Sequence, residues 1–189
     1  MKQLITDEHN PEGKLSHPLT ENHIHLAFTG GEPLLKKYQP MIMEVVDRFL
    51  DDDYSVMFTI ETNGTQQLTE EFANWVVMRE AFFSFSPKLE SVAGEKNAVN
   101  IENIIRVDKR NFSQIKFVAD MSDSCLHEVL LYTKQLRELE YEGDIWVMPK
   151  GETKEDQLNV APVVEKYQQL GFKIATRNHC YIWSNDKNR

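Results

Sequence analysis

Hydrophobic and polar residues alternate along the chain in two patterns, one typical of strands and the other typical of helices. Short apolar segments predict six strands, and longer segments with a helical pattern predict the helices between them. The strands are expected at 24–29, 55–61, 81–86, 114–119, 144–148 and 173–183, the last broken near Arg177. The helices are expected at 40–50, 69–79, 122–139 and 153–170, with a shorter one near 99–107. This order predicts an α/β fold with a mostly parallel sheet, either open or curved toward a barrel.

Local signals mark some ends of these elements. Thr153 with Asp156 approximates a capping box at the start of the last long helix, and Gly171 stands where a helix C-cap is expected. The first 22 residues contain two prolines and a glycine and no regular pattern. We therefore expect an irregular N-terminal arm at 1–22 and one partial barrel domain at 23–189.

Composition excludes several classes of protein. The chain has 189 residues, and its 21 basic and 30 acidic side chains give a formal net charge of −9, which disfavours a direct nucleic-acid partner. No apolar stretch approaches the length of a membrane span, and the N-terminus has no hydrophobic signal region, so we expect a cytoplasmic protein without a membrane partner. The two cysteines, Cys125 and Cys180, indicate neither a disulfide framework nor a cysteine metal site.

The sequence FTGGEPLL at 28–35 interrupts the first alternating segment. The residues before it alternate as a strand does, and a helix is expected to begin at Pro33, a favoured first helical residue. Gly30 and Gly31 form the turn between this strand and this helix and carry no Cβ atoms. A ligand can therefore approach the backbone of the turn closely. A tight strand-to-helix connection without a ligand explains the same residues.

The other predicted strands also end in special residues. Function in parallel α/β proteins collects at the carboxyl ends of the strands. The loops there are TGGEP at 29–33, ETNGT at 61–65, SPK at 86–88, VAD at 118–120, MPKG at 148–151 and RNHCY at 177–181. Their glycines, acceptors and cations suit a polar zwitterion that carries an ammonium, a carboxylate and a ribose. Turn chemistry alone explains each loop singly, and their joint placement favours a site.

In this order and spacing, TGGEP, ETNGT, SPK, KFV at 116–118, MPKG and RNHCYIW resemble the radical S-adenosylmethionine enzymes called 7-carboxy-7-deazaguanine synthases. The resemblance covers about residues 23–184. It implies an incomplete (βα) barrel of the radical S-adenosylmethionine type whose first strand is missing. The strand at 24–29 would then have an unpaired edge.

The resemblance also implies site residues. Gly30 and Gly31 would admit the methionyl amino group of S-adenosylmethionine, and Glu32 would compensate its charge. Thr29 would contact the pterin substrate, together with His179 and Arg177. An isolated histidine in a strand is more often structural, and a solvated charge at a strand end also explains the arginine. The full cofactor set is Gly30, Gly31, Glu32, Glu61, Asn63, Ser86, Pro87, Lys88, Met148, Pro149, Lys150 and Gly151.

The reaction implied by the resemblance is a carbon–nitrogen lyase step in queuosine and deazapurine biosynthesis. It converts 6-carboxy-5,6,7,8-tetrahydropterin to 7-carboxy-7-deazaguanine and ammonia, using S-adenosylmethionine, a [4Fe–4S] cluster and Mg²⁺. The cluster requires three cysteines spaced C-x₃-C-x₂-C upstream of GGEP.

This chain departs from the family at that point, because the 28 residues before Thr29 contain no cysteine. The threonine that holds Mg²⁺ in the family, next to the last cluster cysteine, is missing with it. Cys125 and Cys180 are 55 positions apart and cannot form the cluster loop. A truncated gene, an internal start and a split protein all fit these observations.

Two hypotheses follow from the departure. The chain is either the larger part of such a synthase, or a catalytically inactive remnant that acts as a binding or interaction protein. A homodimer, and a partner chain that supplies the missing N-terminal part, stay open as partners.

Overall fold

The fold is of the α/β class, and its sheet is open and entirely parallel. The computed structural model describes residues 25–50, 57–96, 98–108 and 112–184. Six strands pair in the order in which they occur along the chain, from β1 to β6. Their bounds are β1 Leu26–Phe28, β2 Phe58–Thr62, β3 Phe82–Phe85, β4 Phe112–Ala119, β5 Asp144–Pro149 and β6 Lys173–Ile174.

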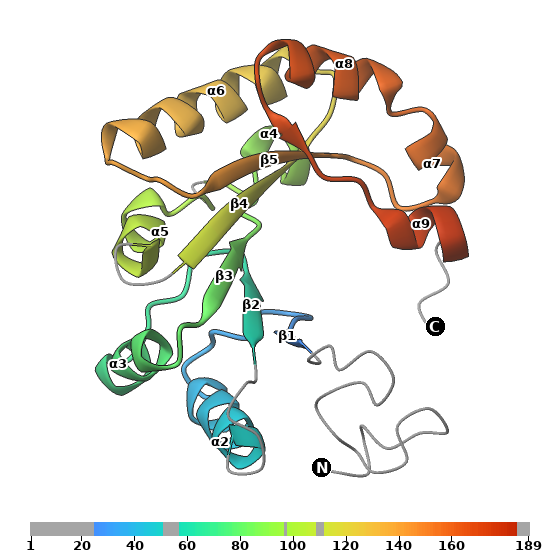
Figure 1. The fold of residues 1–189 in the computed structure, drawn as a ribbon. Coiled ribbons are helices and arrows are strands. Elements are labelled where there is room, and N and C mark those ends of the chain that lie inside the picture. Colours follow the sequence, from blue (N-terminus) through green and yellow to red (C-terminus); the bar gives the residue numbers. More distant parts are fainter. Residues whose placement is uncertain (1–24, 51–56, 97, 109–111, 185–189) are drawn as a thin grey trace.

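The long helices cover one face of this sheet. When strands are added in one direction, right-handed crossovers place every connecting helix on the same side. Figure 1 shows these helices along the convex side of the curved sheet, and none of these long helices lies on its concave side. They are α2 Gln39–Leu50, α3 Glu70–Met78, α5 Ile101–Asp108, α6 Asp123–Glu138 and α8 Ala161–Gln169. The short helices α4 Glu90–Ala93, α7 Lys154–Leu158 and α9 Asn178–Trp183 follow the carboxyl ends of β3, β5 and β6.

Alternation along the strands separates a core face from a concave face. Ile60, Phe83, Phe117 and Val147 point toward the helices and are fully buried. The positions between them are only partly buried on β2 and β5 and on most of β4. The core therefore lies between the sheet and the long helices, while the concave face stays accessible.

Side chains cap the N-termini of α3, α6 and α7, and one of these caps was predicted from the sequence. The Thr69 and Ser122 side chains cap α3 and α6 by accepting from the backbone N–H of Phe72 and Cys125. Thr153 forms the predicted capping box at α7 with Asp156. The box stabilises a shorter helix than expected, because the predicted helix at 153–170 is two helices, α7 and α8. Pro162 in the first turn of α8 cannot continue the α7 hydrogen-bond ladder.

Two other sequence predictions are wrong. The predicted strand at 173–183 is the two-residue strand β6 followed by the helix α9. A short apolar run such as the one in NHCYIW does not distinguish a strand from a buried helix by periodicity. The helix expected from Pro33 begins at Gln39, after a series of turns at 33–38. Pro40 then occupies the first helical turn, where proline is favoured.

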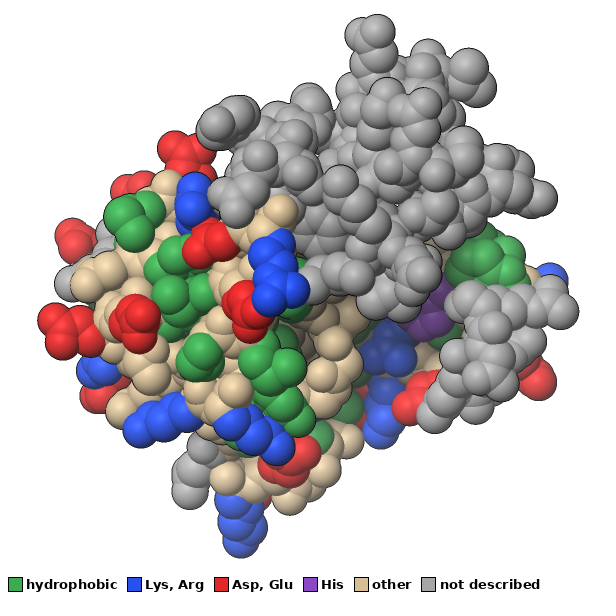
Figure 2. Space-filling view, turned by 90° about the horizontal axis from the view of Figure 1, so that it is seen from below, with side chains coloured by type: hydrophobic (Ala, Val, Ile, Leu, Met, Phe, Trp, Pro, Cys, Tyr) green, Lys and Arg blue, Asp and Glu red, His purple; other side chains and the backbone are tan. Residues whose placement is uncertain are grey.

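The strand β1 lies at one edge of the sheet, as predicted, and pairs within the described residues with β2 alone. The predicted arm at 1–22 lies outside the described residues. None of the described helices is both long and apolar enough to cross a membrane. Figure 2 views the end that carries α2 and α3, and over its described part acidic, basic and hydrophobic side chains are interspersed.

Candidate functional site

The turn after β1 exposes its backbone. Gly30 and Gly31 have φ angles of 86° and 60°, which glycine adopts without strain. A Cβ added at either glycine would have no atom of the described residues within 4 Å. The two glycines are therefore required by the backbone conformation, and they leave open space above the turn.

Glu32 fixes this turn to the neighbouring strand. Its Oε1 atom accepts hydrogen bonds from the Leu34 backbone N–H at 3.0 Å and from the Thr62 hydroxyl at 2.7 Å. Its Oε2 atom accepts from the Asn63 backbone N–H at 3.0 Å. Both oxygens of Glu32 thus hold the loops after β1 and β2 together, whatever further charge they offer to a ligand.

The loop after β2 is a compact turn. The Asn63 side-chain oxygen accepts from the Thr65 backbone N–H at 2.9 Å and from the Thr65 hydroxyl at 2.7 Å. A Cβ added at Gly64 would lie 3.1 Å from Ile104 and 3.2 Å from Phe85. Turn chemistry and packing therefore account for this Asn-Gly pair.

A polar strip crosses the concave face below these loops. The Thr29 hydroxyl donates to Glu61 Oε2 at 2.8 Å, and Lys116 Nζ lies 3.6 Å from Glu61 Oε1. His25 Nε2 lies 2.6 Å from the Thr59 hydroxyl on the same face. The strip brings together side chains from β2, β4 and the segments that flank β1.

A pocket of about 670 Å³ opens where β3, β4 and β5 end. This volume lies in the range of small-molecule sites. Leu89, Val92 and Val118 give it an apolar part. Its other lining residues are Pro87, Lys88, Ala93, Asp120, Lys150, Gly151, Glu152, Thr153, Asp156 and Arg177.

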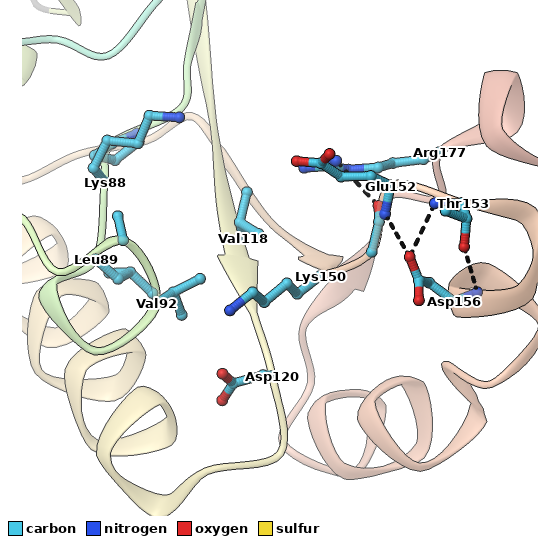
Figure 3. A pocket seen from close by; sticks show the side chains of 13 residues that line it. Lys88, Leu89, Val92, Val118, Asp120, Lys150, Glu152, Thr153, Asp156 and Arg177 are labelled. Carbon is cyan, nitrogen blue, oxygen red and sulfur yellow. Dashed lines mark hydrogen bonds between the residues drawn. The ribbon is translucent and has the colours of Figure 1, made fainter. Parts of the chain in front are cut away.

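Charges of both signs surround the pocket. Lys88 and Lys150 extend into the hollow from opposite sides in Figure 3, and no described residue forms an ion pair with either. Partial burial raises the pKa of Asp120, but the Ser122 hydrogen bonds and then the Lys150 and Lys166 ammonium groups outweigh it, so the net pKa lies below its usual value. A mixed rim of this kind suits a ligand that carries both an ammonium and an anion.

The loop after β5 is held rigidly at the rim of the pocket. Arg177 Nη1 donates to the Gly151 carbonyl at 3.1 Å, and Gln157 Nε2 donates to the same carbonyl at 3.2 Å. The Asp156 carboxylate accepts from the backbone N–H groups of Thr153 and Glu152, which lower its pKa. A Cβ at Gly151 would lie 2.6 Å from the Asp156 Cβ, so glycine is required beside α7.

The structure separates the predicted site residues into two groups. Pro87, Lys88, Lys150, Gly151 and Arg177 line the pocket together. Thr29, Gly30, Gly31, Glu32, Glu61 and Asn63 lie around the ends of β1 and β2. Strand spacing of roughly 4.8 Å puts β1 and β5 about 19 Å apart along the sheet, and its curvature in Figure 1 shortens the path across the concave face.

Four predicted residues lie in neither group. Ser86 donates its backbone N–H to the Thr62 carbonyl at 2.7 Å, and Pro149 is buried at the end of β5. Met148 pairs with Val118 across the β4–β5 ladder, which places it on the concave face. His179 lies exposed in α9 rather than in a strand.

The sequence analysis did not identify some residues of the site. Lys116 and Gln114 alternate with core residues along β4, as Thr59 does along β2 next to the predicted Glu61. Polar residues at every second position of an otherwise apolar strand were the available signal. Asp156 and Thr153 had been assigned only to a helix cap, yet both also line the pocket.

The residues of this chain do not fit an iron–sulfur cluster. Cys125 in α6 and Cys180 in α9 are buried, with 0% and 1% of their surface exposed, and they belong to different helices. Within the described part of the chain, no group of three or more histidine, cysteine, aspartate or glutamate side chains is placed to hold a metal ion. We therefore derive no step through a cluster or Mg²⁺.

No family model matches the chain, and no curated protein matches its sequence. One solved structure that resembles it is described as "Native anSMEcpe with bound AdoMet", with a TM-score of 0.47 and 15% sequence identity. The match covers 82% of this chain and 50% of that chain, so this chain spans about half the length of that structure. At this TM-score and identity, the likeness supports no assignment of function.

Proposed function

We propose that this chain binds S-adenosylmethionine across the carboxyl edge of its sheet, as part of an enzyme of the 7-carboxy-7-deazaguanine synthase type. The observation that carries the proposal is the gathering of the TGGEP, ETNGT, SPK and MPKG loops at one edge of a parallel sheet whose concave face carries none of the long described helices. Such an edge is where parallel α/β proteins bind small ligands.

The residues present suit the parts of S-adenosylmethionine. The open turn at Gly30 and Gly31 admits an ammonium group close to backbone carbonyls. Lys88 and Lys150 offer N–H donors to the adenosine part, and Leu89 and Val92 offer an apolar surface to its adenine ring. In this proposal the residues of this chain bind the cofactor and orient it.

The pterin substrate belongs on the concave face in this proposal. Thr29 and Glu61 present a hydroxyl and a carboxylate beside the turn, and both are accessible. The reaction would be the conversion of 6-carboxy-5,6,7,8-tetrahydropterin to 7-carboxy-7-deazaguanine and ammonia. An S-adenosylmethionine-binding protein without this activity is the second candidate, and the buried, separate cysteines favour it.

Calorimetric titration with S-adenosylmethionine tests the proposal. We expect wild type to bind and Gly31→Val to bind no longer, because a branched side chain would fill the space above the turn. Gly171→Val is the matched control, since Gly171 also has a positive φ and open space but lies at the end of α8. Both variants should lose about 1–3 kcal/mol of unfolding free energy through backbone strain.

The outcomes separate the candidates. Equal affinity of wild type and Gly31→Val would remove the turn from the site. Loss of binding in both valine variants would attribute the effect to strain rather than to the turn. A wild-type protein that does not bind S-adenosylmethionine would contradict the proposed function and also its second candidate.

A further inference from the structure

An ion pair spans the middle of the concave face. Glu61 on β2 and Lys116 on β4 are two strands apart, with Lys116 Nζ 3.6 Å from Glu61 Oε1. Ser84 on the intervening strand pairs with Glu61 in register and is 1% exposed. Because this side chain is small, the lysine can pass over it. Gln114 Nε2 donates to the Ser84 hydroxyl at 3.2 Å, which completes the polar floor beneath the pair.

Glu61 keeps acceptor capacity for a ligand. Its Oε2 atom accepts from the Thr29 hydroxyl at 2.8 Å, and its Oε1 atom faces Lys116. A carboxylate has about four lone-pair directions, so these two partners leave about two of them free. The Glu61 side chain is 44% exposed on the concave face. A ligand with two adjacent N–H donors would therefore meet two acceptors on one rigid carboxylate.

Lys116 fixes the orientation of that carboxylate. Thr29 holds Glu61 from the β1 side, and among the described residues Lys116 is the cation that holds it from the β4 side. The lysine is the more buried partner, with 24% of its side chain exposed. Without Lys116, Glu61 would be tied on one side and free to rotate out of the position that faces a ligand.

We propose that Lys116 is a positioning residue that sets Glu61 to recognise the amino-pyrimidine edge of a planar fused-ring ligand. It acts through Glu61 and does not itself contact the ligand. This inference rests on the proposed function and deepens it, because it names the edge of the pterin that the chain reads. A ring N–H next to an exocyclic amino group supplies the two donors that the carboxylate accepts.

The test compares Lys116→Met with Lys116→Arg, and uses Lys134→Met as the control. Lys134 pairs with Glu138 on the exposed surface of α6, away from the concave face. The probes are 6-carboxypterin, 6-carboxylumazine, which has oxygen in place of the 2-amino group, and S-adenosylmethionine. Titration gives the three affinities, and thermal unfolding checks that each variant is folded.

We expect wild type to prefer the pterin over the lumazine about tenfold or more, the value of one hydrogen bond to a charged group. Lys116→Met should weaken pterin binding about tenfold and remove the preference, while S-adenosylmethionine binds as to wild type. Lys116→Arg should restore the preference, and Lys134→Met should match wild type. If Lys116→Met does not fold, Lys116→Gln carries the same expectation.

Other results would refute either the role of Lys116 or the proposed function. A folded Lys116→Met protein with wild-type pterin affinity and preference would refute the role of Lys116 alone. Parallel loss of pterin and S-adenosylmethionine binding would make Lys116 merely structural. Wild type that binds S-adenosylmethionine but neither ring compound would also refute the positioning role. Wild type that binds none of the three probes would refute the proposed function, and the role of Lys116 with it.

Discussion

At the scale of single residues, a side chain whose sequence context suggests a binding role can instead stabilise the fold. Glu32 is an example, since the sequence suggested a charge for a cofactor, and its two oxygens accept three hydrogen bonds from protein donors. The spacing of GGEP could not reveal this, because two of the three donors come from a loop about 30 positions away along the chain. Long-range pairing of this kind is invisible to local sequence patterns.

Replacing Glu32 by alanine should therefore destabilise the fold. The Thr62 hydroxyl is buried, and it would lose its acceptor together with two backbone N–H groups. We expect a loss of about 2 kcal/mol in the free energy of unfolding, measured by urea denaturation. Glu44→Ala, which removes an exposed partner of Arg48 on α2, should change it by less than about 1 kcal/mol. Equal losses would show that Glu32 does not join the two loops.

Asp108 offers a residue-scale test of pH dependence. Burial first, and then the nearby Glu142 carboxylate, raise its pKa above 3.8, while the Ser113 hydroxyl and Arg137 oppose the shift. A raised pKa means that the folded state binds the proton more tightly, so stability falls as pH rises through the folded pKa. At neutral pH the ionised carboxylate therefore costs stability.

Asp108→Asn should consequently be more stable than wild type at pH 7. The advantage should shrink as the pH falls below 3.8, where wild type is also neutral. Thermal unfolding of both proteins across this pH range provides the measurement. An advantage of the same size at every pH would mean that charge at Asp108 does not explain it.

At the scale of elements, the sequence predicted five of the six strands well and the sixth poorly. Alternation and flanking turn residues located β1 to β5, because both signals lie within each segment. The end of the chain was misread, since α9 is a single turn and a half whose form depends on packing. Tyr181 there donates its hydroxyl to the Gln157 carbonyl in α7 at 2.8 Å. That contact follows from tertiary structure and not from periodicity.

The α7 capping box links element stability to the site. Thr153→Ala and Thr69→Ala each remove an N-cap hydroxyl, so each should cost about 1 kcal/mol of unfolding free energy. Thr153 also lines the pocket, and its loss should loosen the loop after β5. We expect S-adenosylmethionine affinity to fall several-fold in Thr153→Ala and to stay unchanged in Thr69→Ala. Equal S-adenosylmethionine affinities of the two variants in titrations would show that the Thr153 cap does not contribute to binding.

At the scale of the whole molecule, strand order explains why the site is open. A sheet wound in one direction carries its long helices on one face, and closure into a barrel would enclose the other. Here the described sheet stays open, so the strip from Thr29 to Lys116 and the pocket at Lys150 share an accessible side. Sequence could predict the parallel sheet from its alternating elements. It could not predict which polar side chains meet, because their partners lie on neighbouring strands.

The same arrangement bears on metal chemistry. A [4Fe–4S] cluster needs several cysteine thiolates at one place, and this chain has two cysteines, both buried, in α6 and α9. Anaerobic incubation with iron and sulfide should therefore yield no stoichiometric cluster and none of its visible absorption. A variant with both Cys125→Ala and Cys180→Ala should retain the same small amount of iron as wild type. One cluster per wild-type chain that disappears in the double variant would contradict this expectation, because it would require the two cysteines to leave their helices and meet.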